Sequence, residues 1–141
     1  MRILGLDVGD RRIGVAVSDP LGIIAQGVTV IERKTLDEDL KAIKDIIVKY
    51  GAESIVVGMP INMDGTKGKS ADKVTEFVGV LSSSAGIPVA TYDERLSTKE
   101  SEKFLISSDV SRKKRKSVID KIAAQLILES YLERIKNNVR A

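Results

Sequence analysis

Three acidic residues occur at positions where a plain hydrophobic core would not place them. Asp7 interrupts the apolar segment ILGLDV, Glu94 follows the segment IPVATYD, and Asp120 stands within SVIDKIAAQLIL. A buried carboxylate without a compensating partner costs about several kcal/mol. If the three acids converge in the fold, they repel one another unless a cation neutralises them.

The chain contains no His and no Cys. This excludes Ser-His-Asp and Cys-His catalysis, disulfides, and metal sites built from imidazole or thiolate. The carboxylates, lysines, arginines and hydroxyls that remain match hard divalent cations, which prefer oxygen ligands. The three acids therefore predict a site for Mg²⁺ or Mn²⁺ that hydrolyses phosphodiester bonds.

Each acid also has a purely structural interpretation. Asp7 could be a half-buried residue paired with Arg12, and Glu94 could be an ordinary charge at a strand end. Asp120 could stabilise the first turn of a helix, because Ser117 three residues earlier completes a capping box. Against this last interpretation, the small residues Ala123 and Ala124 would let the helix approach a sheet closely, with Asp120 directed toward the first strand.

Hydrophobic patterning predicts the elements that would position these acids. Strands are expected over 2–8, 13–18 and 23–30, as an antiparallel meander. A helix should begin at the capping box of Thr35 and Glu38 and end at Gly51, and a second should end at Gly86. The remaining predicted elements are strands over 54–58 and 87–94 and helices over 70–85, 97–106 and 117–136.

The element order β-β-β-α-β-α-β-α-α predicts an α/β fold with a mixed five-stranded sheet and helices on both faces. Right-handed crossovers place the first strand at the centre of that sheet, with Asp7 near the strand ends. The length of 141 residues fits one domain over 1–141.

The charge of the chain is unevenly distributed. Residues 1–94 carry 11 basic and 14 acidic side chains, a net charge of −3, whereas residues 95–141 carry 12 basic and 6 acidic, a net charge of +6. We expect a basic loop that binds a polyanion, although a solvated loop is the alternative. Its residues are Arg112, Lys113, Lys114, Arg115 and Lys116. With no membrane-spanning or signal segment in the sequence, the expected location is the cytoplasm.

Four ordered motifs carry a family resemblance over nearly the whole chain. The segments LGLDVGDRRIGVAVSD, GMPINMDGTKG, DERLST and IDKIAAQLILESYL together resemble the YqgF/RuvX family of bacterial proteins. The resemblance implies a ribonuclease H-like fold, shared with Holliday-junction resolvases. It also implies a nuclease that acts in maturation of the 5′ end of pre-16S ribosomal RNA.

The resemblance also implies roles for individual residues. The acidic site would be Asp7, Glu94 and Asp120, which would hold the metal. Arg12 and Arg95 would be phosphate or structural partners, and Asn62 would border the same cleft. In the wider fold superfamily the second acid usually lies on the fourth strand, but here that strand ends VVGMP, so Glu94 on the fifth strand must replace it.

Other functions remain open at this stage. RNA is the favoured partner, but a resolvase acting on a DNA junction and a non-catalytic RNA-binding module are alternatives. A nucleotide phosphotransferase is a third, because DVGDRRIGVAV resembles the phosphate-binding hairpin of the actin and sugar-kinase superfamily. Those proteins need two such domains, however, and GTKGKS lacks the spacing of a P-loop.

Overall fold

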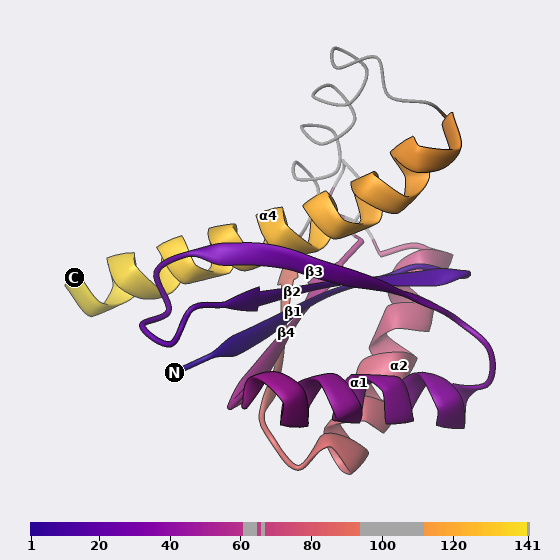
Figure 1. Ribbon diagram of the computed structural model, residues 1–141, viewed down its shortest axis with the longest axis horizontal. Helices are drawn as coiled ribbons and strands as arrows, with labels where there is room; N and C mark the ends of the chain where they lie inside the picture. Colours follow the sequence, from indigo (N-terminus) through magenta and orange to yellow (C-terminus); the bar gives the residue numbers. More distant parts are fainter. Residues whose placement is uncertain (61–64, 66, 94–111, 141) are drawn as a thin grey trace.

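A mixed five-stranded sheet forms the centre of the molecule (Figure 1). The computed structural model describes residues 1–60, 65, 67–93 and 112–140, and includes the side chains of all these except 112–118 and 137–140. The strand order is β3-β2-β1-β4-β5, where β1 is antiparallel to β2 and parallel to β4. The first strand is central, as predicted. The strands are β1 (Ile3–Val8), β2 (Arg12–Ser18), β3 (Ala25–Glu32), β4 (Ser54–Met59) and β5 (Val89–Asp93).

Helices cover both faces of the sheet, which confirms the predicted architecture. Helices α1 (Leu36–Tyr50) and α2 (Lys69–Ala85) lie on one face, and α4 (Arg112–Arg140) crosses the other (Figure 1). The predicted caps of α1 are present. The Thr35 hydroxyl accepts a hydrogen bond from the Glu38 amide at 3.2 Å, and Gly51 ends the helix with a φ of 65°.

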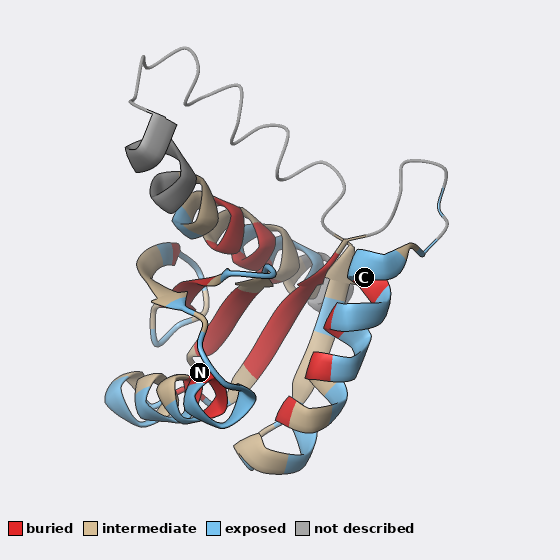
Figure 2. Ribbon diagram, turned by 90° about the vertical axis from the view of Figure 1, so that its right-hand side faces the viewer, coloured by how far each residue is buried: buried red, intermediate tan, exposed pale blue. Residues whose placement is uncertain are grey.

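Alternation along the strands separates two apolar layers. Figure 2 shows the buried residues concentrated on the strands and on the helix sides that face them. The layer under α1 and α2 includes Leu4, Leu6, Ile13, Val15, Ile43, Val57, Phe77 and Leu81. The layer under α4 includes Ile3, Ala16, Val56, Ala124, Ile127, Leu128 and Leu132. Because Asp7 is an even number of positions from Ile3, it faces the α4 side of the sheet.

The third strand begins later than predicted, at Ala25 rather than Ile23. The Asp19 carboxylate is the physical reason. Its Oδ1 accepts hydrogen bonds from the backbone amides of Ile23, at 2.6 Å, and Ile24, at 2.8 Å. These bonds hold both residues in the turn before the strand.

The prediction of a basic loop over 112–116 was wrong, because α4 begins at Arg112 and contains the whole basic run. Lys and Arg are good helix formers, so a run of them can extend a helix as readily as a loop. Ser117 therefore lies inside the helix and is not its N-cap, and Asp120 lies beyond the first turn. The helix predicted over 97–106 falls outside the described residues.

In the part of the chain that the structure covers, no helix has both the length and the apolar character to cross a membrane.

Candidate active site

Three glycines, one on each of β1, β2 and β3, let α4 approach the sheet closely. A Cβ on Gly14 would lie 2.0 Å from the carbonyl oxygen of Asp120. A Cβ on Gly5 would lie 2.9 Å from the Leu128 Cβ, and one on Gly27 would lie 3.1 Å from a carbonyl oxygen of the same helix. At Gly14 a side chain would collide with the helix backbone, and at Gly5 and Gly27 it would press against the helix. The three glycines therefore allow α4 to lie deep on the sheet.

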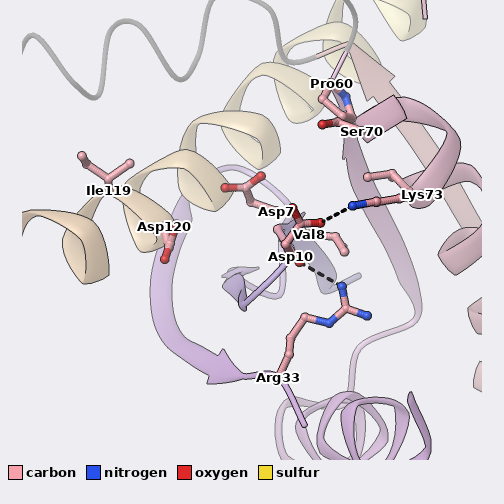
Figure 3. Close-up of a pocket in the computed structure, with 11 residues that line it drawn as sticks. Asp7, Val8, Asp10, Arg33, Pro60, Ser70, Lys73, Ile119 and Asp120 are labelled. Atoms are coloured by element: carbon pink, nitrogen blue, oxygen red, sulfur yellow. Dashed lines mark hydrogen bonds and ion pairs between the residues drawn. The ribbon is translucent and has the colours of Figure 1, made fainter. Parts of the chain in front are cut away.

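This seating brings Asp7 and Asp120 to the same place. Gly14 is the cross-strand partner of Asp7 in the β1–β2 ladder. Because partners in an antiparallel ladder project to the same face, Asp7 lies on the face where the Asp120 backbone meets Gly14. Both acids line an open cleft of about 320 Å³ at the end of β1 (Figure 3).

Arg12 lies between two acids on the same side of the sheet. Its Nη1 is 3.6 Å from Asp120 Oδ2, and its Nε is 3.8 Å from Glu32 Oε1. The side chains of Arg12 and Asp120 are each 26% exposed, so this ion pair is partly screened by water. The pair therefore contributes little to stability.

Two cations line the cleft opposite these acids. In Figure 3, Asp7 and Asp120 lie beside α4, whereas Lys73 extends from α2 and Arg33 approaches from below. Lys73 Nζ is 3.2 Å from Asp10 Oδ1, and both side chains are exposed, at 66% and 76%. The cleft thus has an acidic wall, Asp7 and Asp120, and a cationic wall, Arg33 and Lys73, whose charge is partly offset by Asp10 in the same cleft.

Arg33 is held firmly by its surroundings. Its Nε donates to Asp39 Oδ2 at 3.0 Å, and Asp39 is only 3% exposed. Its Nη1 donates to the carbonyl oxygen of Gly9 at 2.9 Å, and its guanidinium lies 5.2 Å from the ring centroid of Phe77. These contacts tie the β1–β2 turn, which carries Asp10, to both α1 and α2.

The structure brings together only part of the predicted site. Asp7 and Asp120 line the same cleft, and Arg12 forms an ion pair with Asp120. The predicted residues Glu94, Arg95 and Asn62 lie outside the described residues. The basic run lies in the first turns of α4, and its side chains are outside the part of the chain that the structure describes. Its residues are Arg112, Lys113, Lys114, Arg115 and Lys116. Among the described residues, no three Asp, Glu, His or Cys side chains are grouped to hold a metal ion. Asp7 and Asp120 do supply hard oxygen donors from two distant elements, which suits Mg²⁺ or Mn²⁺ chemically.

Sequence reasoning missed Arg33, Lys73 and Asp10. Each is an unremarkable charge in sequence, because Arg33 follows a strand, Lys73 lies on an amphipathic helix and Asp10 lies in a turn. Only the tertiary fold shows that they meet at one cleft. The sequence signal that could have suggested Arg33 is the acid Asp39 on the inner side of the following helix, which needs a buried partner.

Comparison with known proteins identifies the family. A family model described as "RuvX: Holliday junction resolvase" matches residues 1–134. The chain belongs to this RuvX family. A relative from Halothermothrix orenii is 61% identical over 132 residues, which cover 94% of each chain. A relative from Caldanaerobacter subterraneus is 54% identical over 139 residues, which cover 98% of this chain and 100% of the relative. Both are named "Putative pre-16S rRNA nuclease".

Solved structures share the RuvX fold at low sequence identity. RuvC of Thermus thermophilus bound to a Holliday junction matches with a TM-score of 0.56 at 16% identity, covering 96% of each chain. The Holliday junction resolvase of fowlpox virus matches with a TM-score of 0.57 at 12% identity, covering 96% of this chain and 99% of the viral one. These likenesses confirm the predicted ribonuclease H-like fold.

Proposed function

We propose that this RuvX-family protein is a divalent-metal-dependent nuclease that hydrolyses phosphodiester bonds in RNA. Its substrate would be the 5′ end of pre-16S ribosomal RNA, and its place of action the cytoplasm, with residues 1–141 as one domain. The names of its relatives support the activity and the substrate. The observation that carries the proposal is the convergence of Asp7 and Asp120 on one cleft from opposite ends of the chain.

The carboxylates of Asp7, Asp120 and Glu94 would hold Mg²⁺ or Mn²⁺. A bound ion of this kind activates a water for attack and stabilises the leaving oxygen of a phosphodiester. The other residues would prepare the site. Arg12 would orient the Asp120 carboxylate, and the glycine at position 14 lets α4 lie close to β2, beside Asp7. Arg95, Asn62 and the basic run 112–116 would contact the nucleic acid.

Cleavage of defined substrates tests this function. We expect the purified protein with Mg²⁺ or Mn²⁺ to shorten a pre-16S RNA fragment that carries its 5′ extension. Asp7→Asn should lower kcat by about 100-fold or more, because a group that acts in the transition state is lost. Asp45→Asn removes the same charge from the exposed face of α1 and should leave the rate unchanged.

The alternatives give different results in the same experiment. The family description favours a second candidate, a Holliday-junction resolvase, which would cut a four-way DNA junction faster than the RNA fragment. A non-catalytic RNA-binding module would bind the fragment without cutting it under any metal condition. Equal cleavage by wild type and Asp7→Asn would mean that the activity does not belong to this cleft.

A further inference from the structure

The cationic wall of the cleft has no assigned role in the acid-based chemistry. Arg33 and Lys73 line the same cleft as Asp7 and Asp120, and they form ion pairs with Asp39 and Asp10. A nuclease must hold a polyanion against a site that is itself acidic, so cations close to those acids have an evident use. We propose that Arg33 and Lys73 form a phosphate-binding subsite, which holds a backbone phosphate next to the scissile bond. This proposal rests on the proposed nuclease function.

Arg33 is the fixed member of the subsite. Asp39 and the Gly9 carbonyl accept one hydrogen bond each from the guanidinium, which has five N–H donors. Phe77 and Asp39 also restrict the orientation of the side chain, so the guanidinium loses little conformational entropy when it binds a phosphate. The planar guanidinium matches two phosphate oxygens at once.

Lys73 is the exchangeable member. Its ion pair with Asp10 joins two exposed side chains, and such pairs are weak in water. A phosphate oxygen can therefore replace Asp10 as the partner of Lys73 at little cost. Asp10 then competes with the substrate phosphate for Lys73. Substitution of Lys73 should therefore weaken RNA binding, and substitution of Asp10 should strengthen it.

Binding without turnover separates this subsite from catalysis. The probe is a fluorescein-labelled RNA fragment carrying the pre-16S 5′ extension, measured with wild-type protein in EDTA over a range of KCl concentrations. Lys73→Ala should weaken the affinity by about fivefold and reduce the slope of log K against log salt by about 0.7 to 0.9, because one phosphate contact is lost. Asp10→Asn should tighten binding by about threefold, because the competing anion is removed.

Matched variants control for net charge. Lys44→Ala removes one positive charge, as Lys73→Ala does, and Asp45→Asn removes one negative charge, as Asp10→Asn does. Both control residues lie on the exposed face of α1, away from the cleft, so each control should change the affinity by less than about 1.5-fold. In the cleavage assay, Lys73→Ala should raise KM while kcat changes by less than about twofold, as expected for loss of uniform binding. Arg33→Lys keeps the charge but loses the planar donor set, and should also raise KM.

Equal affinities and equal salt slopes for Lys73→Ala and Lys44→Ala would overturn the subsite. Because Lys73 is exposed, its substitution should leave the fold intact even if Arg33→Lys impairs folding. The two proposals also fail separately. Wild-type protein that binds RNA but never cuts it contradicts the nuclease function, whereas the affinity comparison still decides whether Arg33 and Lys73 bind phosphate.

Discussion

Gly14 is the residue on which the geometry of the candidate site most directly depends. Its missing side chain leaves the space that the backbone of Asp120 occupies beside β2, opposite Asp7 in the ladder. A Cβ there would meet backbone atoms, which cannot rotate away as a flexible side chain can. The two candidate acids, from β1 and α4, are thus kept at one cleft by a residue that has no side-chain chemistry of its own.

Gly14→Ala should therefore lower the free energy of unfolding by about 3 kcal/mol, because α4 must shift away from the sheet. Urea unfolding followed by circular dichroism measures this loss. Gly79→Ala is the matched control, because Gly79 lies in α2 with nothing within 4 Å of its added Cβ. That control should gain about 0.8 kcal/mol from helix propensity. Equal stabilities of wild type and Gly14→Ala would mean that α4 is not closely seated.

Asp39 and Arg33 illustrate what sequence could and could not predict at this scale. Asp7 and Asp120 stood out because a carboxylate within an apolar pattern is unusual. Arg33 and Asp39 fit their local patterns, as a charge after a strand and an acid in the first turn of a helix. Arg33 is fixed in place by its ion pair with Asp39 and by its hydrogen bond to the Gly9 carbonyl. These contacts form only after the β1–β2 turn, the segment after β3 and α1 have packed together.

At the scale of elements, the turn between β2 and β3 depends on one carboxylate. The hydrogen bond from the Ile24 amide lowers the pKa of Asp19 most, desolvation opposes this effect, and the Ile23 amide lowers the pKa further. The charged form is therefore favoured in the folded state. Its contribution to stability is present above the unfolded value of 3.8 and is lost as the pH falls through the lower folded-state pKa.

Asp19→Asn keeps an oxygen acceptor but removes the charge. We expect the variant to be less stable than wild type at neutral pH, and the difference to shrink as the pH falls from about 5 to about 2. Urea midpoints at a series of pH values measure this convergence. A difference that stays constant with pH would show that the charge of Asp19 contributes nothing to the turn.

The sequence predicted that the last helix begins at Ser117, whereas α4 begins five residues earlier, at Arg112. The prediction failed because a basic run is equally compatible with a loop and with a helix. In the structure the run lies at the helix N-terminus, and no acidic residue is in the first turn. Positive charges are unfavourable at this end of the helix dipole. A polyanion bound to these residues would relieve that repulsion, which agrees with their predicted role in nucleic-acid binding.

The double variant Lys113→Glu with Arg115→Glu tests that role. It should weaken binding of the pre-16S RNA fragment by about tenfold or more and flatten its salt dependence, because two phosphate contacts are lost. Glutamates favour the N-terminus of a helix, so α4 should remain helical by circular dichroism. Retention of both affinity and salt slope would assign the phosphate contacts to other residues.

At the scale of the whole molecule, the sheet order followed from sequence because it depends on general rules. A meander followed by two β-α-β units with right-handed crossovers leaves β1 in the centre, and the structure has this order. The depth at which α4 lies on the sheet did not follow from these rules. It depends on glycines from three separate strands, Gly5 and Gly27 in one row of the sheet and Gly14 two residues further along, and this arrangement is visible only in three dimensions.

Metal binding should therefore be a property of the folded molecule, since Asp7 and Asp120 are distant in sequence and meet only after α4 packs. A ligand of the native state raises apparent stability, by about 1.4 kcal/mol at ten times its dissociation constant. For a chain of this size we expect Mn²⁺ to raise the melting temperature by about 4 °C relative to EDTA. Asp120→Asn should abolish this difference, whereas Asp45→Asn should retain it.

The comparison is made within each variant, because Asp120→Asn also breaks the ion pair with Arg12 and lowers the baseline stability. An undiminished Mn²⁺ shift in Asp120→Asn would mean that the ion binds elsewhere, and that α4 carries its carboxylate to the cleft for another purpose.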